Sequence, residues 1–265
     1  MEAINKFYLI NGKVKEVKDF TENNEKGSVI YEVLRVINGN PAFLVAHIER
    51  MKKSFELVNK RFPFTNEELI SYVNKVIESN NKAIGNIKIT YNTALKELKV
   101  YYIKHSYPSD ELYKNGVKTI LYYGERENPN AKIVNSTFRE KVTEEIKKAH
   151  AFEAILVDRN GFITEGSKSN IFAIEAGKLV TAKGEAVLKG ITREKIMNIA
   201  AEIGLEVEEK DIKASEIEKL DAMFISGTSP KILPIAFVDD IKLDVNNKEL
   251  RKLMQAYDGI LEEKR

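Results

Sequence analysis

The sequence predicts a protein of mixed helices and strands, divided into two domains. Stretches with apolar residues at every third or fourth position, typical of amphipathic helices, alternate with stretches rich in β-branched residues, typical of strands. A proline and small polar residues interrupt both patterns at residues 106–110, and such segments favour an exposed boundary. A chain of 265 residues is long enough for two domains. We therefore expect a domain at 1–107, a linker at 108–113 and a domain at 114–265.

Local signals place the elements of the first domain. Thr65 and Glu68, three residues apart, match the capping box that begins a helix. In the strand over 28–36, alternation puts Tyr31, Val33 and Arg35 on one face. The turn residues at 38–41 predict a hairpin that returns through a short strand. We expect strands at 28–36, 42–44, 84–91 and 98–103, and helices at 46–58 and 65–79.

The second domain reads as an antiparallel sheet with helices. Gly204 follows an amphipathic run in the position that favours a left-handed helix end. The turn at 158–161 separates two short runs of β-branched and apolar residues. We expect strands at 117–123, 154–158, 162–164, 170–174, 179–181 and 221–226, and helices at 137–150, at 192–203 and from about 247.

Composition excludes several functions. A formal charge of +2 gives no field for holding a polyanion, so we expect no nucleic-acid partner. The chain has no cysteine, and its three histidines are far apart in sequence, so we expect no metal site. The sequence has neither a run of 18 apolar residues nor a basic and apolar leader, so we expect no membrane partner and a cytoplasmic location.

Two residues are candidates for chemistry. Lys132 follows proline and asparagine and precedes an Ile-Val pair, which together indicate irregular, partly buried backbone. Desolvation generally makes the neutral, nucleophilic amine of a lysine more accessible. The alternative is a solvated surface lysine, which is the commoner case. Glu165 lies between two predicted strands, followed by small polar residues, and an ordinary polar hairpin turn is equally compatible with this pattern.

Three further segments could bind an anion such as a phosphate. The residues from Leu188 to Arg193 lead into a helix, whose first amides and positive dipole end favour an anion, although Thr192 could be only an N-cap. Thr228 follows a predicted buried strand in what could also be an ordinary turn. Arg50 lies three residues after His47 on one side of a helix, and a surface ion pair would explain it equally well.

These segments form an ordered set of motifs that extends from Tyr31 to about Pro234. The motifs are Tyr31-Glu32-Val33-Leu34-Arg35, His47-Ile48-Glu49-Arg50, Lys132-Ile133-Val134-Asn135, Glu153-Ala154-Ile155-Leu156, Thr164-Glu165-Gly166-Ser167-Lys168-Ser169-Asn170, Gly190-Ile191-Thr192-Arg193 and Ser226-Gly227-Thr228-Ser229. In this order they resemble the fold type IV enzymes that use pyridoxal 5'-phosphate (PLP). That family includes branched-chain aminotransferases, D-amino acid aminotransferases and aminodeoxychorismate lyases.

The resemblance implies a role for each candidate residue. Lys132 would hold PLP as a Schiff base and move the substrate proton, and Glu165 would pair with the pyridinium nitrogen. Leu188 would pack against the ring. The residues implied for the phosphate are Arg50, Gly190, Ile191, Thr192 and Thr228, and those implied for the substrate are Tyr31, Val33, Arg35, Tyr91, Thr228 and Ser229.

The resemblance also implies a fold and an activity. The expected α+β architecture has a small α/β domain and a larger, mostly antiparallel β domain with flanking helices, and PLP lies in the cleft between them. The expected protein is a homodimer that transfers an amino group between an amino acid, of branched-chain or D type, and a 2-oxo acid. The alternatives are a 4-amino-4-deoxychorismate lyase, releasing pyruvate and 4-aminobenzoate, and a binding protein that kept the fold without turnover.

The chain departs from the family pattern at positions that bear on the substrate. The glycine-rich segment that commonly precedes Tyr31 is shortened to Glu25-Lys26-Gly27. Well-known branched-chain enzymes carry a tyrosine five residues after the lysine, where this chain has Thr137. Asn135, three residues after Lys132, is more similar to the D-amino acid enzymes and the lyases. Yet the arginine that D-amino acid enzymes present to the substrate carboxylate is missing from the strand segment Thr90-Tyr91-Asn92.

Overall fold

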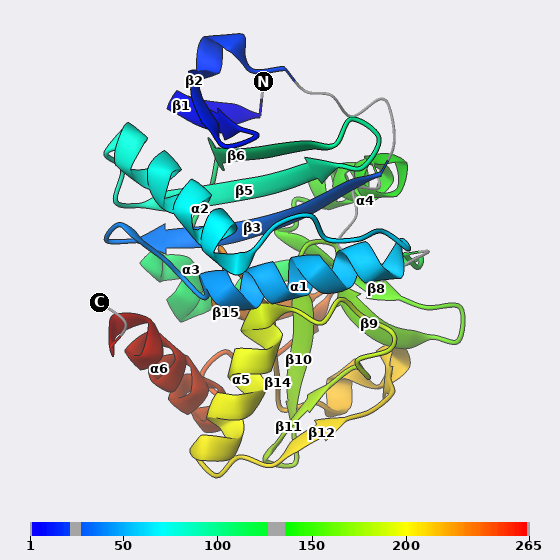
Figure 1. Cartoon of the computed structure of the whole chain (residues 1–265). Helices are drawn as coiled ribbons and strands as arrows, with labels where there is room; N and C mark the ends of the chain where they lie inside the picture. The colour runs from blue at the N-terminus through cyan, green and yellow to red at the C-terminus, as the bar shows by residue number, and fades with distance from the viewer. Residues whose placement is uncertain (1, 22–27, 127–135, 264–265) are drawn as a thin grey trace. The chain divides into compact units, whose positions relative to one another are not determined.

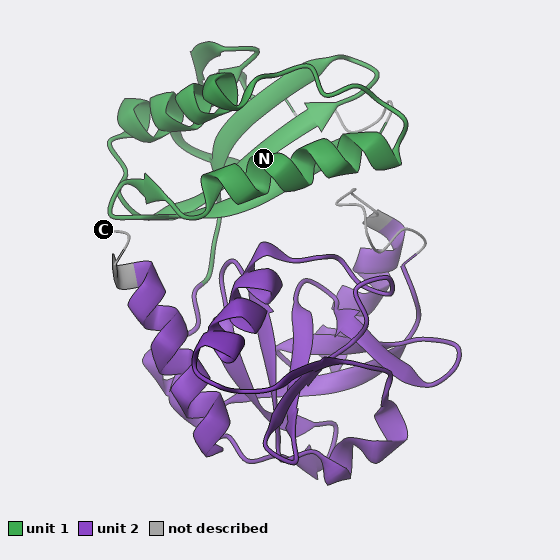
Figure 2. Cartoon of the chain, turned by 60° about the horizontal axis from the view of Figure 1, so that its bottom comes forward, with its two compact units in different colours: residues 1–106, 131–134, 265 green, residues 107–130, 135–264 purple. Residues whose placement is uncertain are grey.

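The computed structural model describes residues 2–21, 28–126 and 136–263, which divide into two compact units (Figure 2). The chain leaves the first unit at Ser106 and enters the second at Tyr107. The expected linker at 108–113 overlaps α3 (Asp110–Asn115), which begins after Ser109 because the Ser109 side chain accepts a hydrogen bond from the Leu112 amide. Since α3 packs against a strand of the second unit, the segment belongs to that unit.

The first unit is built on a six-stranded sheet in the order β2-β1-β6-β5-β3-β4. Every neighbouring pair in this sheet is antiparallel. The sequence did not predict β1 and β2. The elements are β1 (Ala3–Ile10), β2 (Lys13–Glu16), the 3-10 helix η1 (Val17–Asp19), β3 (Val29–Ile37), β4 (Asn40–Pro41), α1 (Leu44–Leu57), α2 (Asn66–Asn80), β5 (Gly85–Asn92) and β6 (Glu97–Ile103).

Helices α1 and α2 cover one face of this sheet (Figure 1). Their buried side chains, such as Met51 and Val73, pack in one cluster with Leu34 of β3 and Ile89 of β5. The capping box that begins α2 is present as predicted. The expected strand at 42–44 is wrong, because Phe43 adopts a left-handed φ of 54° and the helix begins at Leu44; the return strand is β4.

The second unit contains a ten-stranded sheet that is mostly antiparallel. The strands run in the order β12-β11-β10-β14-β15-β7-β8-β9-β13, with β16 beside β15 and an additional contact between β9 and β10. Besides α3, the elements are β7 (Val117–Tyr123), α4 (Ser136–Lys148), β8 (Glu153–Val157), β9 (Phe162–Gly166), β10 (Asn170–Glu175), β11 (Lys178–Thr181), α5 (Ile191–Glu202), β12 (Val207–Glu209), β13 (Ile212–Lys213), the 3-10 helix η2 (Ala214–Lys219), β14 (Ala222–Gly227), β15 (Lys231–Val238), β16 (Ile241–Lys242) and α6 (Lys248–Glu263).

Helices flank this sheet on both faces. Ile196 of α5 and Leu253 of α6 pack with Phe172 and Phe224, whose rings stack 5.0 Å apart on neighbouring strands. Residues of η2 pack with the opposite face. Gly204 has a φ of 78°, the left-handed conformation predicted for the end of α5. The expected α+β architecture of two domains is confirmed. No helix within the described residues is both long and apolar enough to cross a membrane.

Candidate functional site

Glu165, at the end of β9, presents a buried carboxylate that is bound on both oxygens. Its Oε1 accepts a hydrogen bond from Arg126 Nη1 at 2.9 Å, and its Oε2 accepts one from the Leu188 amide at 3.0 Å. The Glu165 side chain is only 5% exposed. Because each carboxylate oxygen can accept more than one hydrogen bond, these two contacts do not prevent Glu165 from accepting a further donor.

Arg126 is a site residue that sequence reasoning missed. It lies in the segment after β7, 39 residues before the carboxylate that it binds. In the sequence it stands between Glu125 and Glu127, where an arginine is most simply read as a surface charge. No local sequence pattern predicts such a long-range ion pair. The only sequence signal for Arg126 is its position six residues before Lys132.

The segment from Leu188 to Gly190 is held against β10 by Asn170. The Asn170 Nδ2 group donates to the Leu188 carbonyl at 2.8 Å. A Cβ atom on Gly190 would collide with Asn170 Oδ1, so only glycine allows this close approach. Leu188 is thereby fixed through both its backbone groups, its amide by Glu165 and its carbonyl by Asn170.

Helix α5 begins directly after this segment with no side chain capping its N-terminus. The N-cap residue is Gly190, and Ile191 and Thr192 form the first turn. The alternative interpretation of Thr192 as the N-cap is therefore wrong. The first amides of a helix have no intrahelical acceptor, and the helix dipole adds positive potential there. This end of α5 is suited to bind an anion.

Glu153 shapes the turn that follows Glu165. Its Oε1 accepts hydrogen bonds from the Ser167 hydroxyl and the Ala154 amide, and its Oε2 accepts one from the Ser169 hydroxyl at 3.2 Å. Burial raises the pKa of Glu153 above its ordinary value, although these hydrogen bonds act in the opposite direction. The Gly166 amide donates to the Ser169 carbonyl across the same turn. Sequence reasoning assigned no separate role to Glu153.

The turn with Thr228 and Ser229 lies at the same end of the sheet. It connects β14 to β15, whose pairing places Gly227 opposite Lys231. Asn170, at the start of β10, pairs with Ser226 at the end of β14 and with Glu165 at the end of β9. The second unit therefore brings together the predicted residues Glu165, Leu188, Gly190, Ile191, Thr192, Thr228 and Ser229.

In the first unit, Arg50 of α1 forms a buried ion pair with Glu32 of β3. Arg50 Nε lies 2.8 Å from Glu32 Oε1, and Arg50 Nη2 lies 2.6 Å from Glu32 Oε2. His47 Nδ1 also lies 2.7 Å from Oε2. Burial raises the pKa of Glu32, but the charge and hydrogen bonds of Arg50, with the hydrogen bond from His47, outweigh it and lower the pKa to about 2. Arg50 Nη1 has no partner among the described residues.

The substrate-side candidates of the first unit do not all share a face of the sheet. Tyr31, Val33 and Arg35 lie opposite Thr90, Lys88 and Asn86, and residues opposite each other on paired strands point to one face. Tyr91 lies opposite Ile30 and points to the other face, where its ring is 5.1 Å from that of Phe55. The structure brings the first three together and separates Tyr91 from them.

Lys132 lies outside the described residues. The structure therefore describes the other residues implied for the PLP ring and phosphate, and the role of Lys132 stays a prediction. Among the residues with described positions, no three His, Asp or Glu side chains are placed to bind a metal ion together.

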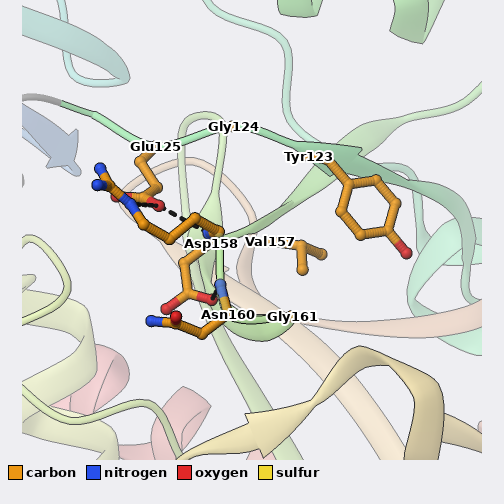
Figure 3. Close-up of a pocket in the computed structure, with 8 residues that line it drawn as sticks. Tyr123, Gly124, Glu125, Val157, Asp158, Asn160 and Gly161 are labelled. Atoms are coloured by element: carbon orange, nitrogen blue, oxygen red, sulfur yellow. Dashed lines mark hydrogen bonds and ion pairs between the residues drawn. The ribbon is translucent and has the colours of Figure 1, made fainter.

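A surface pocket of the second unit lies apart from the predicted residues (Figure 3). Its charged side chains are bound within the protein. Arg159 Nε lies 3.0 Å from Glu125 Oε1, and Asp158 Oδ1 accepts hydrogen bonds from the backbone amides of Asn160 and Phe162. The Tyr123 and Glu125 side chains lie on opposite sides of the pocket. It is lined by Tyr123, Gly124, Glu125, Val157, Asp158, Arg159, Asn160 and Gly161.

Comparison with known families identifies the family to which the chain belongs. Residues 29–238 match the family model described as amino-transferase class IV. The chain belongs to the class IV aminotransferases. Enzymes of this class use PLP, and the family model and the named relatives indicate a transaminase. The resemblance of the sequence motifs to this family is confirmed.

The relatives of this class IV aminotransferase are named for different substrates. The chain is 28% identical over 249 residues to the D-alanine aminotransferase of Bacillus licheniformis, covering 87% of this chain and 88% of that protein. It is 28% identical over 237 residues to the branched-chain-amino-acid aminotransferase of Pseudomonas aeruginosa, covering 81% and 76% of the two chains.

Solved structures share the fold at lower identity. The branched-chain aminotransferase of the archaeon Thermoproteus uzoniensis, solved with norvaline, has a TM-score of 0.88 and 22% identity, covering 97% of this chain and 95% of that one. A provisionally assigned 4-amino-4-deoxychorismate lyase of Legionella pneumophila has a TM-score of 0.81 and 22% identity, covering 92% and 97%. These likenesses establish the fold and leave the substrate open.

The residues of the second unit fit PLP. The protonated ring nitrogen of PLP needs an anionic partner, and the buried carboxylate of Glu165 would be such a group. Its phosphate needs donors, which the uncapped first turn of α5 supplies. Gly190 lets the backbone of this segment lie close to Asn170, so no side chain of its own obstructs the start of the helix.

Proposed function

We propose that this class IV aminotransferase moves an amino group between an amino acid, of branched-chain or D type, and a 2-oxo acid, with Lys132 carrying the cofactor. The observation that carries the proposal is the arrangement around Glu165. Its buried carboxylate is bound by Arg126 and by the Leu188 amide, two residues before the uncapped end of α5. One short segment thus connects an acceptor for a ring nitrogen with donors for a phosphate.

PLP, when bound, supplies an electron-withdrawing ring that stabilises negative charge at the substrate carbon. Glu165 accepts the N–H of the ring nitrogen and keeps its proton in place. Arg126 holds the Glu165 carboxylate in the required orientation through the 2.9 Å ion pair. Leu188, fixed by its backbone hydrogen bonds, packs against the ring.

The phosphate is held by the amides of Ile191 and Thr192 and by the Thr228 hydroxyl. We also propose Arg50 as a phosphate-binding residue. Its Nε and Nη2 atoms bind Glu32, and Nη1 is the guanidinium nitrogen that does not contact this carboxylate. Lys132 Nζ would take the proton from the substrate Cα and deliver it to the C4′ carbon of the cofactor, and it would carry the proton back in the second half-reaction. The substrate residues in our proposal are Tyr31, Val33 and Arg35 of the first unit and Thr228 and Ser229 of the second. Tyr91 is not included, since it points to the other face of the sheet.

A donor screen tests the proposal. The purified holoenzyme should absorb near or above about 400 nm, as lysine-bound PLP does. Single L- and D-amino acids are added in turn, and a productive donor shifts the absorbance, which 2-oxoglutarate then restores. The absence of a shift with every donor would contradict an aminotransferase and favour a binding protein without turnover.

The lyase is a second candidate, favoured by Asn135 at the third position after Lys132. The same holoenzyme is incubated with 4-amino-4-deoxychorismate, and pyruvate and 4-aminobenzoate are measured. Release of both products without the reversible shift given by amino acids would replace the aminotransferase with the lyase. We further propose that the protein is a homodimer. Light scattering on the protein eluted from a size-exclusion column measures its molar mass and tests this directly.

A further inference from the structure

Lys88 lies in a row of side chains that crosses three strands on the face of Tyr31. In the pairing of β3 with β5, Val33 lies opposite Lys88, and in that of β5 with β6, Lys88 lies opposite Tyr101. Lys88 Nζ is also 5.2 Å from the centre of the Tyr31 ring. Lys88 therefore lies beside Val33 and close to the Tyr31 ring, two residues of the face assigned to the substrate.

Lys88 and Tyr101 already hold a carboxylate, that of Glu2. Lys88 Nζ lies 2.6 Å from Glu2 Oε1, and the Tyr101 hydroxyl donates to Glu2 Oε2 at 2.8 Å. The Lys88 side chain is only 13% exposed. A shielded cation and a hydroxyl on one carboxylate form a charge-assisted pair of donors, which is the chemistry required to recognise a substrate carboxylate.

Glu2 is held less firmly than the two donors. Its side chain is 36% exposed, and it precedes β1, so the backbone ladder does not fix it. Lys88 and Tyr101 both lie inside paired strands. A carboxylate from solution can therefore compete for the same donors while the donors stay in place.

Lys99 is on the same face but is engaged elsewhere. Thr90 lies opposite Lys99, which places Lys99 one row away from Lys88. Its ammonium lies 2.7 Å from Glu97 Oε1 and 2.7 Å from the Thr21 carbonyl. Lys99 therefore already binds two acceptors of the first unit, the Glu97 carboxylate in its own strand and the Thr21 carbonyl after η1.

We propose that Lys88 binds a carboxylate of the substrate and that Glu2 occupies the Lys88 and Tyr101 donors until the substrate displaces it. This inference rests on the proposed function, which assigns the face of Tyr31 and Val33 to the substrate. It gives this chain a carboxylate-binding cation although no arginine is present in the segment Thr90-Tyr91-Asn92.

Calorimetric titration of the holoenzyme with unreactive probes tests the inference. The probes are 3-methylbutanoate, glutarate and the uncharged 3-methylbutanamide. Lys88→Met should raise the Kd of the carboxylates about tenfold or more, the loss of one charge-assisted hydrogen bond, and leave the amide unchanged. Glu2→Gln should lower the same Kd, because it removes the competing carboxylate. Lys88→Arg should retain most of the affinity.

Lys75→Met is the matched control, since Lys75 Nζ lies 5.9 Å from the Tyr72 ring, a similar contact outside the proposed site. This variant should bind all probes like the wild type. A loss of affinity for both carboxylates assigns Lys88 to the α-carboxylate, and a loss for glutarate alone assigns it to a side-chain carboxylate; both support the inference.

Two results would overturn the inference. One is an unchanged Kd of the carboxylates in Lys88→Met, and the other is a Kd in Glu2→Gln that rises as much as in Lys88→Met. Either result would make the ion pair of Lys88 with Glu2 a purely structural contact. Thermal melting and the absorbance near 400 nm, characteristic of lysine-bound PLP, show that each variant is folded and loaded. Since the probes do not react, their binding is measured even if the donor screen finds no transamination, so the two proposals fail separately.

Discussion

Two buried glutamates, one in each unit, show opposite pKa shifts. Glu32 in the first unit is fully buried, yet its pKa is lowered to about 2 from an ordinary 4.5. Glu153 in the second unit is buried to a similar degree, and its pKa is raised. Burial acts in the same direction on both groups, because a low-dielectric environment disfavours a charged carboxylate.

The difference comes from the donors. Glu32 faces the guanidinium of Arg50 in a bidentate arrangement, with His47 as a third donor. Glu153 is bound by two hydroxyls and one amide, which are neutral. Three neutral donors reduce the cost of burial without reversing it, whereas a paired cation reverses it. The first arrangement fixes an arginine suited to a phosphate, and the second shapes a turn beside Glu165.

The largest expected effect is that of Glu32→Gln. The substitution leaves the guanidinium of Arg50, whose side chain is 12% exposed, without its counter-charge. Breaking a buried ion pair in this way costs about 3–5 kcal/mol. Urea unfolding at pH 7 measures the loss. Glu16→Gln, which breaks the exposed pair with Lys18, is the control and should leave the unfolding free energy unchanged. A loss below about 1 kcal/mol in Glu32→Gln would remove the ion pair as the cause of the lowered pKa.

The pH dependence of the same pair gives the next largest effect. Because the folded pKa of Glu32 is lowered, its contribution is fully present above pH 4.5 and is lost as the pH falls toward about 2. A shift from 4.5 to about 2 corresponds to about 3 kcal/mol. The unfolding free energies of the wild type and Glu32→Gln should therefore converge over this range. A gap that stays constant with pH would contradict the assignment.

Glu153 should respond to pH with the opposite sign. Its folded pKa is raised, so its contribution is present below its ordinary pKa and is lost as the pH rises through the folded pKa. Glu153→Gln removes this dependence and should gain stability relative to the wild type as the pH rises. Glu153→Ala leaves the buried Ala154 amide and the part-buried Ser167 and Ser169 hydroxyls without their acceptor and should cost about 2 kcal/mol. A relative loss in Glu153→Gln with rising pH would reverse the sign we assign.

Ser169→Ala is expected to have the smallest effect. It removes one neutral hydrogen bond to Glu153, 3.2 Å long, and should cost about 1 kcal/mol or less. Because that hydrogen bond lowers the pKa of Glu153, its loss should move the pH dependence of stability further upward. Thermal melting between pH 5 and 8 measures both changes. A downward movement would show that the hydroxyl does not favour the charged form.

The sequence predicted elements whose signals are local. The capping box of Thr65 and Glu68 and the left-handed end at Gly204 depend on residues a few positions apart, and the structure has both. Strand β15 was missed, since Pro234 lacks an amide and usually argues against an interior strand. In the structure Pro234 lies opposite Phe224, between β14 and β7.

Pairings between distant residues could not be predicted. Arg126 meets Glu165 across 39 positions, and Glu153 meets Ser169 across 16, because strands from separate parts of the chain lie side by side. The family motifs identified Glu165 and the segment from Leu188 to Thr192. They did not identify the residues that bind them, such as Arg126. Tyr91 was assigned to the substrate from the strand segment Thr90-Tyr91-Asn92, and that assignment gave no information about which face of β5 the side chain occupies.

The assignment of Lys132 as the cofactor lysine is tested most directly by borohydride reduction and peptide mapping. Reduction of the holoenzyme locks PLP to its lysine, and mass spectrometry then locates the modified peptide. We predict that the label is on Lys132 and that Lys132→Ala yields no labelled peptide. A label on any other lysine in the wild type, or a label retained in Lys132→Ala, would contradict the account.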